Sequence, residues 1–274
     1  MNINLTTNHS NYLDTFIPTN VENISSKKFT NLPEETLSTF FQNSISGKFL
    51  SLKGVDLILN YLREKGAIQI PVETASGYTQ LTEYIDRISK LPDGKYGLIF
   101  CSNPPHVTPI LFEIEDGECT IVITDSFGLK GDSSARISKW IFDFTGTRSY
   151  IYTEQRQLSK TDCYNISIRD MVYMSKNKNF KSFVMDNSTD EQTECMISLH
   201  KLPIEMHKIT QNHTILSDDE LKTLIPSQKS DTGQITLKQA IFKYSEKGNL
   251  RAVKNFEKYE TIISDFFKNS QDFQ

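Results

Sequence analysis

Apolar residues recur every three or four positions in two segments of the first third of the chain. This spacing predicts amphipathic helices over residues 55–65 and 78–90. A further helix is predicted to begin near Leu32, because Pro33 and the two glutamates after it fit a first helical turn. Residues 1–30 hold few large apolar side chains and are rich in Asn, Thr and Ser, so we expect a disordered polar leader there.

The pattern changes in the middle of the chain. Short apolar runs predict buried strands over residues 96–101, 107–114, 119–125 and 148–154. Asp116-Gly117 separates the second and third of these runs and suits a tight hairpin turn. Helical spacing returns in three places, over residues 134–144, directly after Cys163 and over 238–267. This order indicates an α+β fold with a mixed central sheet flanked by helices.

Composition excludes several classes of protein. The 274 residues suffice for a core without disulfides, and the formal charge of -4 gives no sign of nucleic-acid binding. The cysteines, which form neither a CxxC pair nor a zinc-ligand spacing, are Cys101, Cys119, Cys163 and Cys195. We therefore expect reduced thiols and no metal site. No apolar run is long enough to span a membrane, and the start lacks the pattern of a Sec signal peptide.

Four residues in the middle of the chain have the order of a thiol-nucleophile site. His106 precedes Asp125, and Gln157 lies six positions before Cys163. In this arrangement the cysteine attacks a carbonyl, the histidine removes its proton and the acid orients the imidazole. The glutamine would donate hydrogen bonds to the oxyanion.

The predicted hairpin gives these residues a geometric relation. His106 starts one strand and Asp125 ends its partner, so antiparallel pairing places the two side chains next to each other. Asp162 is a suitable N-cap, which puts Cys163 in the first turn of the following helix. Backbone N–H groups and the helix dipole there stabilise a thiolate.

Each residue also has an ordinary interpretation. A histidine after Pro-Pro is commonly a surface residue, an Asp before Ser-Phe-Gly commonly ends a strand, and a cysteine on a helix is commonly inert core. None of these interpretations predicts the hairpin pairing. The joint order and spacing therefore favour a catalytic site.

The site resembles that of the CE clan of cysteine enzymes, and within that clan the YopJ family of bacterial effector acetyltransferases. The likeness runs through the interval from His106 to Asp125, the Gln-x5-Cys segment from Gln157 to Cys163, and the Leu-Pro…Lys-x-Thr-Gln segment over residues 202–211. Two positions depart from the family pattern. Tyr164 stands where the family has Gly, which puts the size of the acyl group in doubt, and Ile209 stands where the family has His.

The resemblance implies a catalytic core over residues 31–200 and a helical regulatory region over 201–274 that packs with residues 31–65. It implies transfer of an acetyl group from acetyl-CoA, through a Cys163 thioester, to Ser, Thr or Lys of host signalling proteins. It also implies secretion into the host cell cytoplasm, for which residues 1–30 are a possible signal. Lys208 matches the lysine at which relatives modify themselves.

Family members are activated by inositol hexakisphosphate, and the resemblance implies a basic site for this molecule. A polyanion needs convergent cations. The candidates are Lys53, Lys243, Lys247, Arg251, Lys254 and Lys258. The last four share a helical face, which is equally consistent with a solvated surface balanced by nearby glutamates.

Two other functions use the same residues. A CE-clan deubiquitinase or ubiquitin-like protease has the same triad, but such enzymes usually carry Trp beside the catalytic His. Here Val107 follows His106 and the only tryptophan, Trp140, is distant in sequence. A binding module with a vestigial triad is the remaining alternative. Oligomeric state and the target protein stay open.

Overall fold

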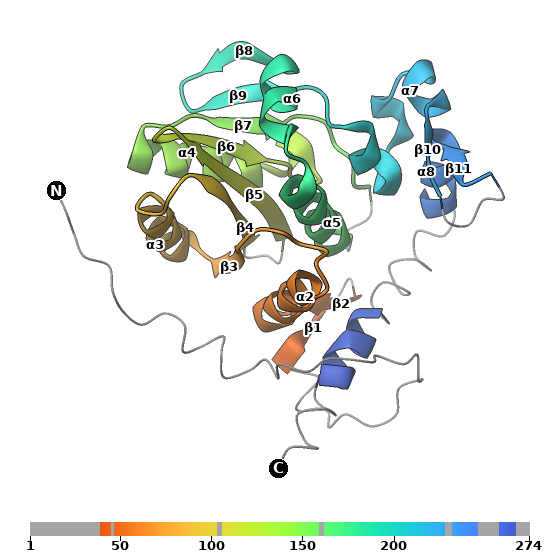
Figure 1. Cartoon of the computed structure of the whole chain (residues 1–274), viewed down its shortest axis with the longest axis horizontal. Coiled ribbons are helices and arrows are strands. Elements are labelled where there is room, and N and C mark those ends of the chain that lie inside the picture. Colours follow the sequence, from red (N-terminus) through yellow and green to blue (C-terminus); the bar gives the residue numbers. More distant parts are fainter. Residues whose placement is uncertain are drawn as a thin grey trace.

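The computed structural model describes residues 39–44, 47–102, 106–158, 162–227, 232–245 and 258–266. The polar leader over residues 1–30 and the predicted start of a helix near Leu32 lie outside these ranges. Figure 1 shows a central sheet with helices on both faces, and a smaller group of elements beside it formed by the C-terminal part of the chain. The fold is therefore α+β, as the sequence predicts.

A seven-stranded mixed sheet forms the centre of the molecule, in the order β3-β4-β5-β6-β7-β9-β8. Its strands are β3 (Val72–Ser76), β4 (Gly94–Ser102), β5 (His106–Glu115), β6 (Glu118–Ile123), β7 (Ser149–Tyr152), β8 (Ser188–Thr193) and β9 (Met196–Leu199). The β4-β5-β6 meander is antiparallel, whereas β3 joins β4, β6 joins β7 and β7 joins β9 in parallel. Long apolar runs in β4 and β5 fit their central position, where both faces of the sheet are covered.

Two hydrophobic cores lie on the two faces of the sheet. Helices α3 (Tyr78–Ile88) and α4 (Ser133–Thr145) bury their apolar faces in one core. Helices α2 (Leu52–Glu64), α5 (Cys163–Lys176) and α6 (Phe180–Asp186) contribute to the other. The helical segment over residues 258–266 also enters this second core, and Figure 1 places it near α2.

The C-terminal part of the chain forms a small separate core of apolar side chains. It is built from η3 (Ile204–Ile209), η4 (His213–Ile215), α7 (Asp218–Lys222), β10 (Leu224–Pro226), β11 (Gln234–Thr236) and α8 (Leu237–Ser245). A capping box between Ser217 and Glu220 starts α7. Among the described residues, no helix is long and apolar enough to cross a membrane. The division into a catalytic core and a regulatory region remains a prediction.

Several elements differ from the sequence prediction. A hairpin of β1 (Phe41–Ser44) and β2 (Gly47–Leu50) was not expected, and Phe41 belongs to this strand instead of the predicted helix. The sequence analysis also missed β3, β8 and β9. Strand β8 reads Ser-Thr-Asp-Glu-Gln-Thr, which has no apolar alternation because it lies at the edge of the sheet. The predicted helix over 238–267 is described only at its two ends.

Candidate active site

His106 and Asp125 are in direct contact. The His106 Nε2 atom lies 2.8 Å from Oδ1 and 2.9 Å from Oδ2 of the carboxylate. Asp125 is fully buried and the histidine side chain is 13% exposed. The contact predicted from the hairpin is therefore present.

The β5–β6 turn produces this contact. Asp116 and Gly117 have φ values of 52° and 80°, the left-handed conformation that a two-residue hairpin turn requires at both positions. The strands then pair from Glu115↔Glu118 to Ile110↔Ile123. Beyond that last pair, the chain brings the Asp125 carboxylate to the face of β5 that carries the His106 and Thr108 side chains.

Two further groups hold the Asp125 carboxylate. The Thr108 hydroxyl donates to Oδ2 at 3.1 Å, and the Phe127 backbone N–H donates to Oδ1 at 2.8 Å. Thr108 lies two residues after His106 on the same face of β5, so one strand supplies both side-chain partners. The Phe127 ring packs against the imidazole with centroids 5.1 Å apart. The carboxylate and the imidazole ring are both fixed in orientation.

Cys163 is the first residue of α5 and is 1% exposed. The helix is attached to the histidine strand by a hydrogen bond from the Ser167 hydroxyl to the Val107 carbonyl, at 2.8 Å. Burial alone lowers the pKa of His106, but hydrogen bonds to Asp125 and Cys163 and their negative charge raise it to about 10. The imidazole is therefore protonated at neutral pH and stands beside the sulfur as a cation, which stabilises a thiolate.

Asp162 occupies the N-cap position of α5, as the sequence predicts. Its side chain makes no capping hydrogen bond, and its backbone lies in the bridge region, with φ -93° and ψ 2°. The carboxylate instead accepts hydrogen bonds from the side-chain amides of Asn165 and Gln211. Asp162 thus ties the nucleophile turn to the segment after η3.

Gln157 is fully buried next to the Asp125 turn. Its Oε1 accepts a hydrogen bond of 2.6 Å from the Ser126 hydroxyl, and its backbone N–H donates to the Ser126 carbonyl at 2.9 Å. These contacts fix the side-chain amide, with the oxygen engaged by Ser126. Its role as an oxyanion donor stays a prediction.

The sequence analysis missed a buried ion pair beside Gln157. Arg156 and Asp170 are 0% and 1% exposed, and the guanidinium binds both carboxylate oxygens. Arg156 also donates to the Thr124 carbonyl at 2.9 Å, and the Thr124 hydroxyl donates to Asp170 at 2.9 Å. The pair therefore connects the end of β6, the loop that carries Gln157 and the middle of α5. A charged residue directly before the predicted oxyanion residue was the available signal.

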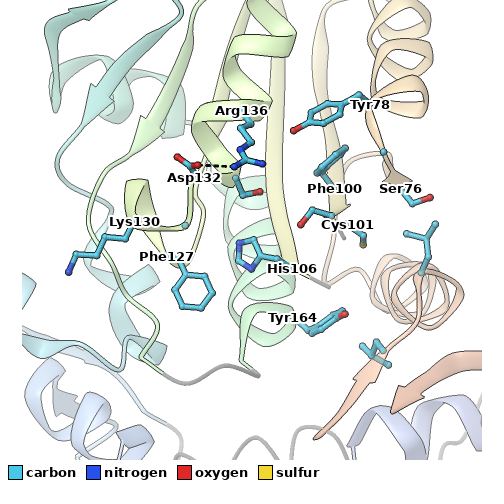
Figure 2. Close-up of a pocket in the computed structure, with 16 residues that line it drawn as sticks. Ser76, Tyr78, Phe100, Cys101, His106, Phe127, Lys130, Asp132, Arg136 and Tyr164 are labelled. Atoms are coloured by element: carbon cyan, nitrogen blue, oxygen red, sulfur yellow. Dashed lines mark hydrogen bonds and ion pairs between the residues drawn. The ribbon is translucent and has the colours of Figure 1, made fainter. Parts of the chain in front are cut away.

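A pocket of about 1000 Å³ opens next to His106. Figure 2 shows His106 between Phe127 and Tyr164, with Arg136 and Tyr78 at the opposite end of the pocket. Tyr164, the residue that departs from the family pattern, is 7% exposed and lines this pocket. Cys101, on β4, lines it as well.

The candidate polyanion residues are only partly described. Lys53 in α2 and Lys258 at the start of the 258–266 segment are both exposed. Lys243 lies in α8, and only its backbone is described. The remaining candidates, Lys247, Arg251 and Lys254, lie outside the described residues. Of the six candidates, only the side chains of Lys53 and Lys258 are described, so the polyanion site stays a prediction.

The segment over 202–211 packs behind the site. Lys208 is partly exposed in η3, whereas Ile209 is buried. His207 is also buried, packs against the Tyr152 ring and lies 3.2 Å from the Thr210 hydroxyl. Burial and the charge of Arg156 lower the pKa of His207 to about 3, so its imidazole is neutral. A neutral, enclosed imidazole is a packing element and gives no sign of replacing the family histidine.

Several solved structures have a fold similar to that of this chain. HopZ1a in complex with IP6 and CoA superposes with a TM-score of 0.54 at 13% identity, over 70% of this chain and 74% of that chain. HopZ1a with IP6 gives 0.56 at 13% identity over 78% and 84%, and a deletion variant of AvrA with IP6 and CoA gives 0.51 at 12% identity over 77% and 84%. HopZ1a and AvrA are effectors of the YopJ family. The chain has the fold that the sequence resemblance implies.

No protein-family profile matches the chain, and no curated protein matches its sequence. At 12–13% identity the likeness to these structures establishes the fold alone.

Proposed function

We propose that this protein is an effector acetyltransferase that moves an acetyl group from acetyl-CoA, through a thioester on Cys163, to Ser, Thr or Lys of host proteins. The observation that carries the proposal is the His106–Asp125 pair, coupled to a cysteine at a helix N-terminus. The solved structures with the same fold contain CoA and IP6, which supports acetyl-CoA as the donor and IP6 (inositol hexakisphosphate) as an activator.

In the first step Cys163 attacks the acetyl carbonyl carbon as a thiolate, while His106 carries the proton of the thiol. The bond between that carbon and the CoA sulfur then breaks, and the imidazolium returns a proton to the CoA thiolate. Because Nε2 is bound to Asp125, the other ring nitrogen, Nδ1, is the one that exchanges the proton. Gln157 would stabilise the oxyanion through its amide N–H.

In the second step the acceptor hydroxyl or amine attacks the thioester. His106 removes the acceptor proton, and the Cys163 thiolate leaves with the electron pair of the broken C–S bond. The immobilised Asp125 carboxylate stabilises the imidazolium that forms in both steps.

Lys53 and Lys258 are the described residues that would hold the activator, together with the four other cations predicted from the sequence. The 258–266 segment joins the same core as α2, whose first turn carries Lys53. This shared core supports a site formed by cations of these two segments. Tyr259 packs against this core. Burial raises its pKa, and the charges of Arg169 in α5 and of Asp162 directly before α5 also act on it. Binding of a polyanion to the 258–266 segment would therefore act on the nucleophile helix.

Inositol hexakisphosphate should raise the melting temperature by mass action. Paired Lys53→Glu and Lys258→Glu substitutions should reduce that rise, while Lys139→Glu on the exposed face of α4 should leave it unchanged. Arg251→Glu with Lys254→Glu tests the candidates outside the described residues. An undiminished rise in both double variants would place the polyanion elsewhere.

Intact mass spectrometry after incubation with acetyl-CoA, with and without inositol hexakisphosphate, tests the acyl-enzyme directly. We expect the gain of one acetyl group, lost in Cys163→Ala and retained in Cys101→Ala. A ubiquitin-like activity probe serves as the competing reagent. Labelling of Cys163 by that probe, with no acetyl gain from acetyl-CoA, would identify a CE-clan protease instead.

We further propose that the protein acts in the host cell after secretion, with residues 1–30 as the export signal. A reporter fused to residues 1–30 should be exported from a bacterium that carries a matching secretion system. Export of a fusion that lacks these residues would contradict the assignment.

A further inference from the structure

The pocket next to His106 has two chemically different ends. At the catalytic end it is lined by His106, Phe127 and Tyr164, and at the distal end by Tyr78 and Arg136. The distal end lies between the first turns of α3 and α4, which belong to segments far apart in the sequence. Substrate groups in the distal end would be bound while a reacting atom sits at the histidine.

The distal end has an aromatic wall. The Tyr78 ring lies 5.4 Å from the Phe100 ring and 4.7 Å from the Trp140 ring, measured between centroids. Trp140 is fixed by a hydrogen bond from its Nε1 to the Thr82 hydroxyl at 3.0 Å, yet it is 42% exposed. The wall therefore continues from the pocket onto the molecular surface, as a binding face for an extended segment would.

The distal end also favours a negative charge. Figure 2 shows the Arg136 guanidinium and the Tyr78 hydroxyl at this same end of the pocket. Burial raises the pKa of Tyr78, and the charge of Arg136 opposes the rise. Arg136 is bound to Asp132 at 3.0 Å, but the two side chains are 71% and 72% exposed. An exposed pair of this kind contributes little stability, so Arg136 can exchange Asp132 for another carboxylate at little cost. Asp132 forms no side-chain cap with α4, so the backbone N–H groups of that helix do not hold its carboxylate.

The start of α4, which carries Arg136, is connected to the proposed catalytic residues by hydrogen bonds. Ser133, the first residue of α4, has its hydroxyl 3.4 Å from the Thr108 hydroxyl, which in turn donates to Asp125. A ligand held at the start of α4 is thus positioned against the same framework that orients His106.

We propose that this pocket binds the acceptor polypeptide, and that Arg136 selects segments in which an acidic side chain lies near the acceptor residue. The inference rests on the proposed acetyl transfer and adds a substrate class to it. CoA is a poorer occupant of the distal end, because its pyrophosphate and 3′-phosphate need several convergent cations. Lys130 also lines the pocket, but Figure 2 shows its amine pointing away from the distal end. At that end one arginine faces one aspartate, and this balance suits a single carboxylate beside an apolar or aromatic side chain.

The test uses an array of short peptides, each with one central Lys, Ser or Thr and one Asp, Asn or Lys at a varied neighbouring position. Binding is measured with the full-length Cys163→Ala protein, so that the result does not depend on acetyl transfer. We expect Asp peptides to bind about tenfold more tightly than their Asn counterparts, as a charge-assisted hydrogen bond provides. Arg136→Glu should reverse the preference towards Lys peptides.

Lys139→Glu is the matched control, because Lys139 lies on the same helix in a similar exposed i,i+4 pair with Asp143 but does not line the pocket. It should keep the preference for Asp. Unchanged Asp preference in Arg136→Glu, or no preference in the parent protein, would overturn the inference. A rise in the KM for acetyl-CoA in Arg136→Glu without any change in peptide preference would instead assign the pocket to the donor.

The acetylation of Cys163 by acetyl-CoA is followed in the parent protein in parallel. Its failure would contradict the proposed function, whereas the peptide preference is decided by binding alone. The two claims can therefore fail separately.

Discussion

Two arginine–aspartate pairs lie near the candidate active site in opposite environments. Arg156 and Asp170 are buried behind the loop that carries Gln157, whereas Arg136 and Asp132 stand exposed on the rim of the pocket. The buried pair has lost its water and is bound by backbone and hydroxyl groups on several sides. The exposed pair stays in contact with solvent, so water or a ligand can take the place of either partner.

The difference shows how one pair of residue types serves two purposes. A buried pair is costly to break, because removal of one partner leaves an uncompensated charge in the interior. It therefore fixes the position of the loop and of α5. An exposed pair adds little stability and leaves its arginine available to a ligand.

The largest effect is expected within the buried network at the proposed catalytic centre. Asp125→Asn keeps the shape of the side chain but removes the charge that orients His106, so acetyl transfer should fall by roughly 10⁴-fold. Turnover with acetyl-CoA is the measurement, with the circular dichroism spectrum as the control for folding. Turnover like that of the parent protein would remove Asp125 from the mechanism.

The next largest effect concerns the buried ion pair itself. Arg156→Met leaves Asp170 buried without its partner, so the free energy of unfolding should fall by about 3–5 kcal/mol. Arg136→Met, at the exposed pair, should lower it by less than about 1 kcal/mol. Urea unfolding of both variants measures the contrast. Equal losses would show that burial does not distinguish the two pairs.

A partly buried carboxylate without an arginine sharpens the comparison. Burial raises the pKa of Asp56 to about 6, although a 2.6 Å hydrogen bond from Thr74 opposes the rise. The folded state then binds more protons than the unfolded state between pH 3.8 and about 6, so stability falls as the pH rises through that range. Asp56→Asn should therefore stabilise the protein above pH 6, by at most about 3 kcal/mol.

Thermal unfolding of Asp56→Asn at pH 4 and at pH 8 provides the measurement. The gain should appear only at the higher pH. The matched control is Asp86→Asn on α3, since Asp86 is exposed in an i,i+4 pair with Lys90 and should change stability little at either pH. A gain of equal size at both pH values would exclude burial of the Asp56 charge as its cause.

The smallest effect is expected at the rim of the pocket. Asp132→Asn removes the exposed partner of Arg136, and Asn tolerates the left-handed backbone at this position, where φ is 60°. The free energy of unfolding should change by less than about 1 kcal/mol, and 1 M salt should remove most of the change. A large loss that persists in high salt would mean that the pair is structural after all.

Local signals were sufficient for the centre of the fold and for the His106–Asp125 contact. The Asp116-Gly117 turn fixes the register of the β5–β6 hairpin, which brings the end of β6 beside the start of β5, where Asp125 contacts His106. The helix that starts at Cys163 was also predicted, because its apolar spacing is long and regular.

Features that depend on distant segments escaped the sequence analysis. Strand β8 is held by its pairing with β9, and its own residues carry no apolar period. The Arg156–Asp170 pair joins a loop to a helix, and no local period predicts such a contact. Likewise, Tyr78 and Arg136 become neighbours only when α3 and α4 pack on one face of the sheet.

Titration of the His106 imidazole by NMR tests the central claim, that His106, Asp125 and Cys163 act as one unit, without any substrate. The His106 signal is identified by its absence in His106→Gln. In the parent protein the ring should stay protonated through neutral pH and titrate near 10, and the midpoint should fall in both Asp125→Asn and Cys163→Ala. A midpoint near the ordinary histidine value of 6.5 that neither substitution moves would contradict the account.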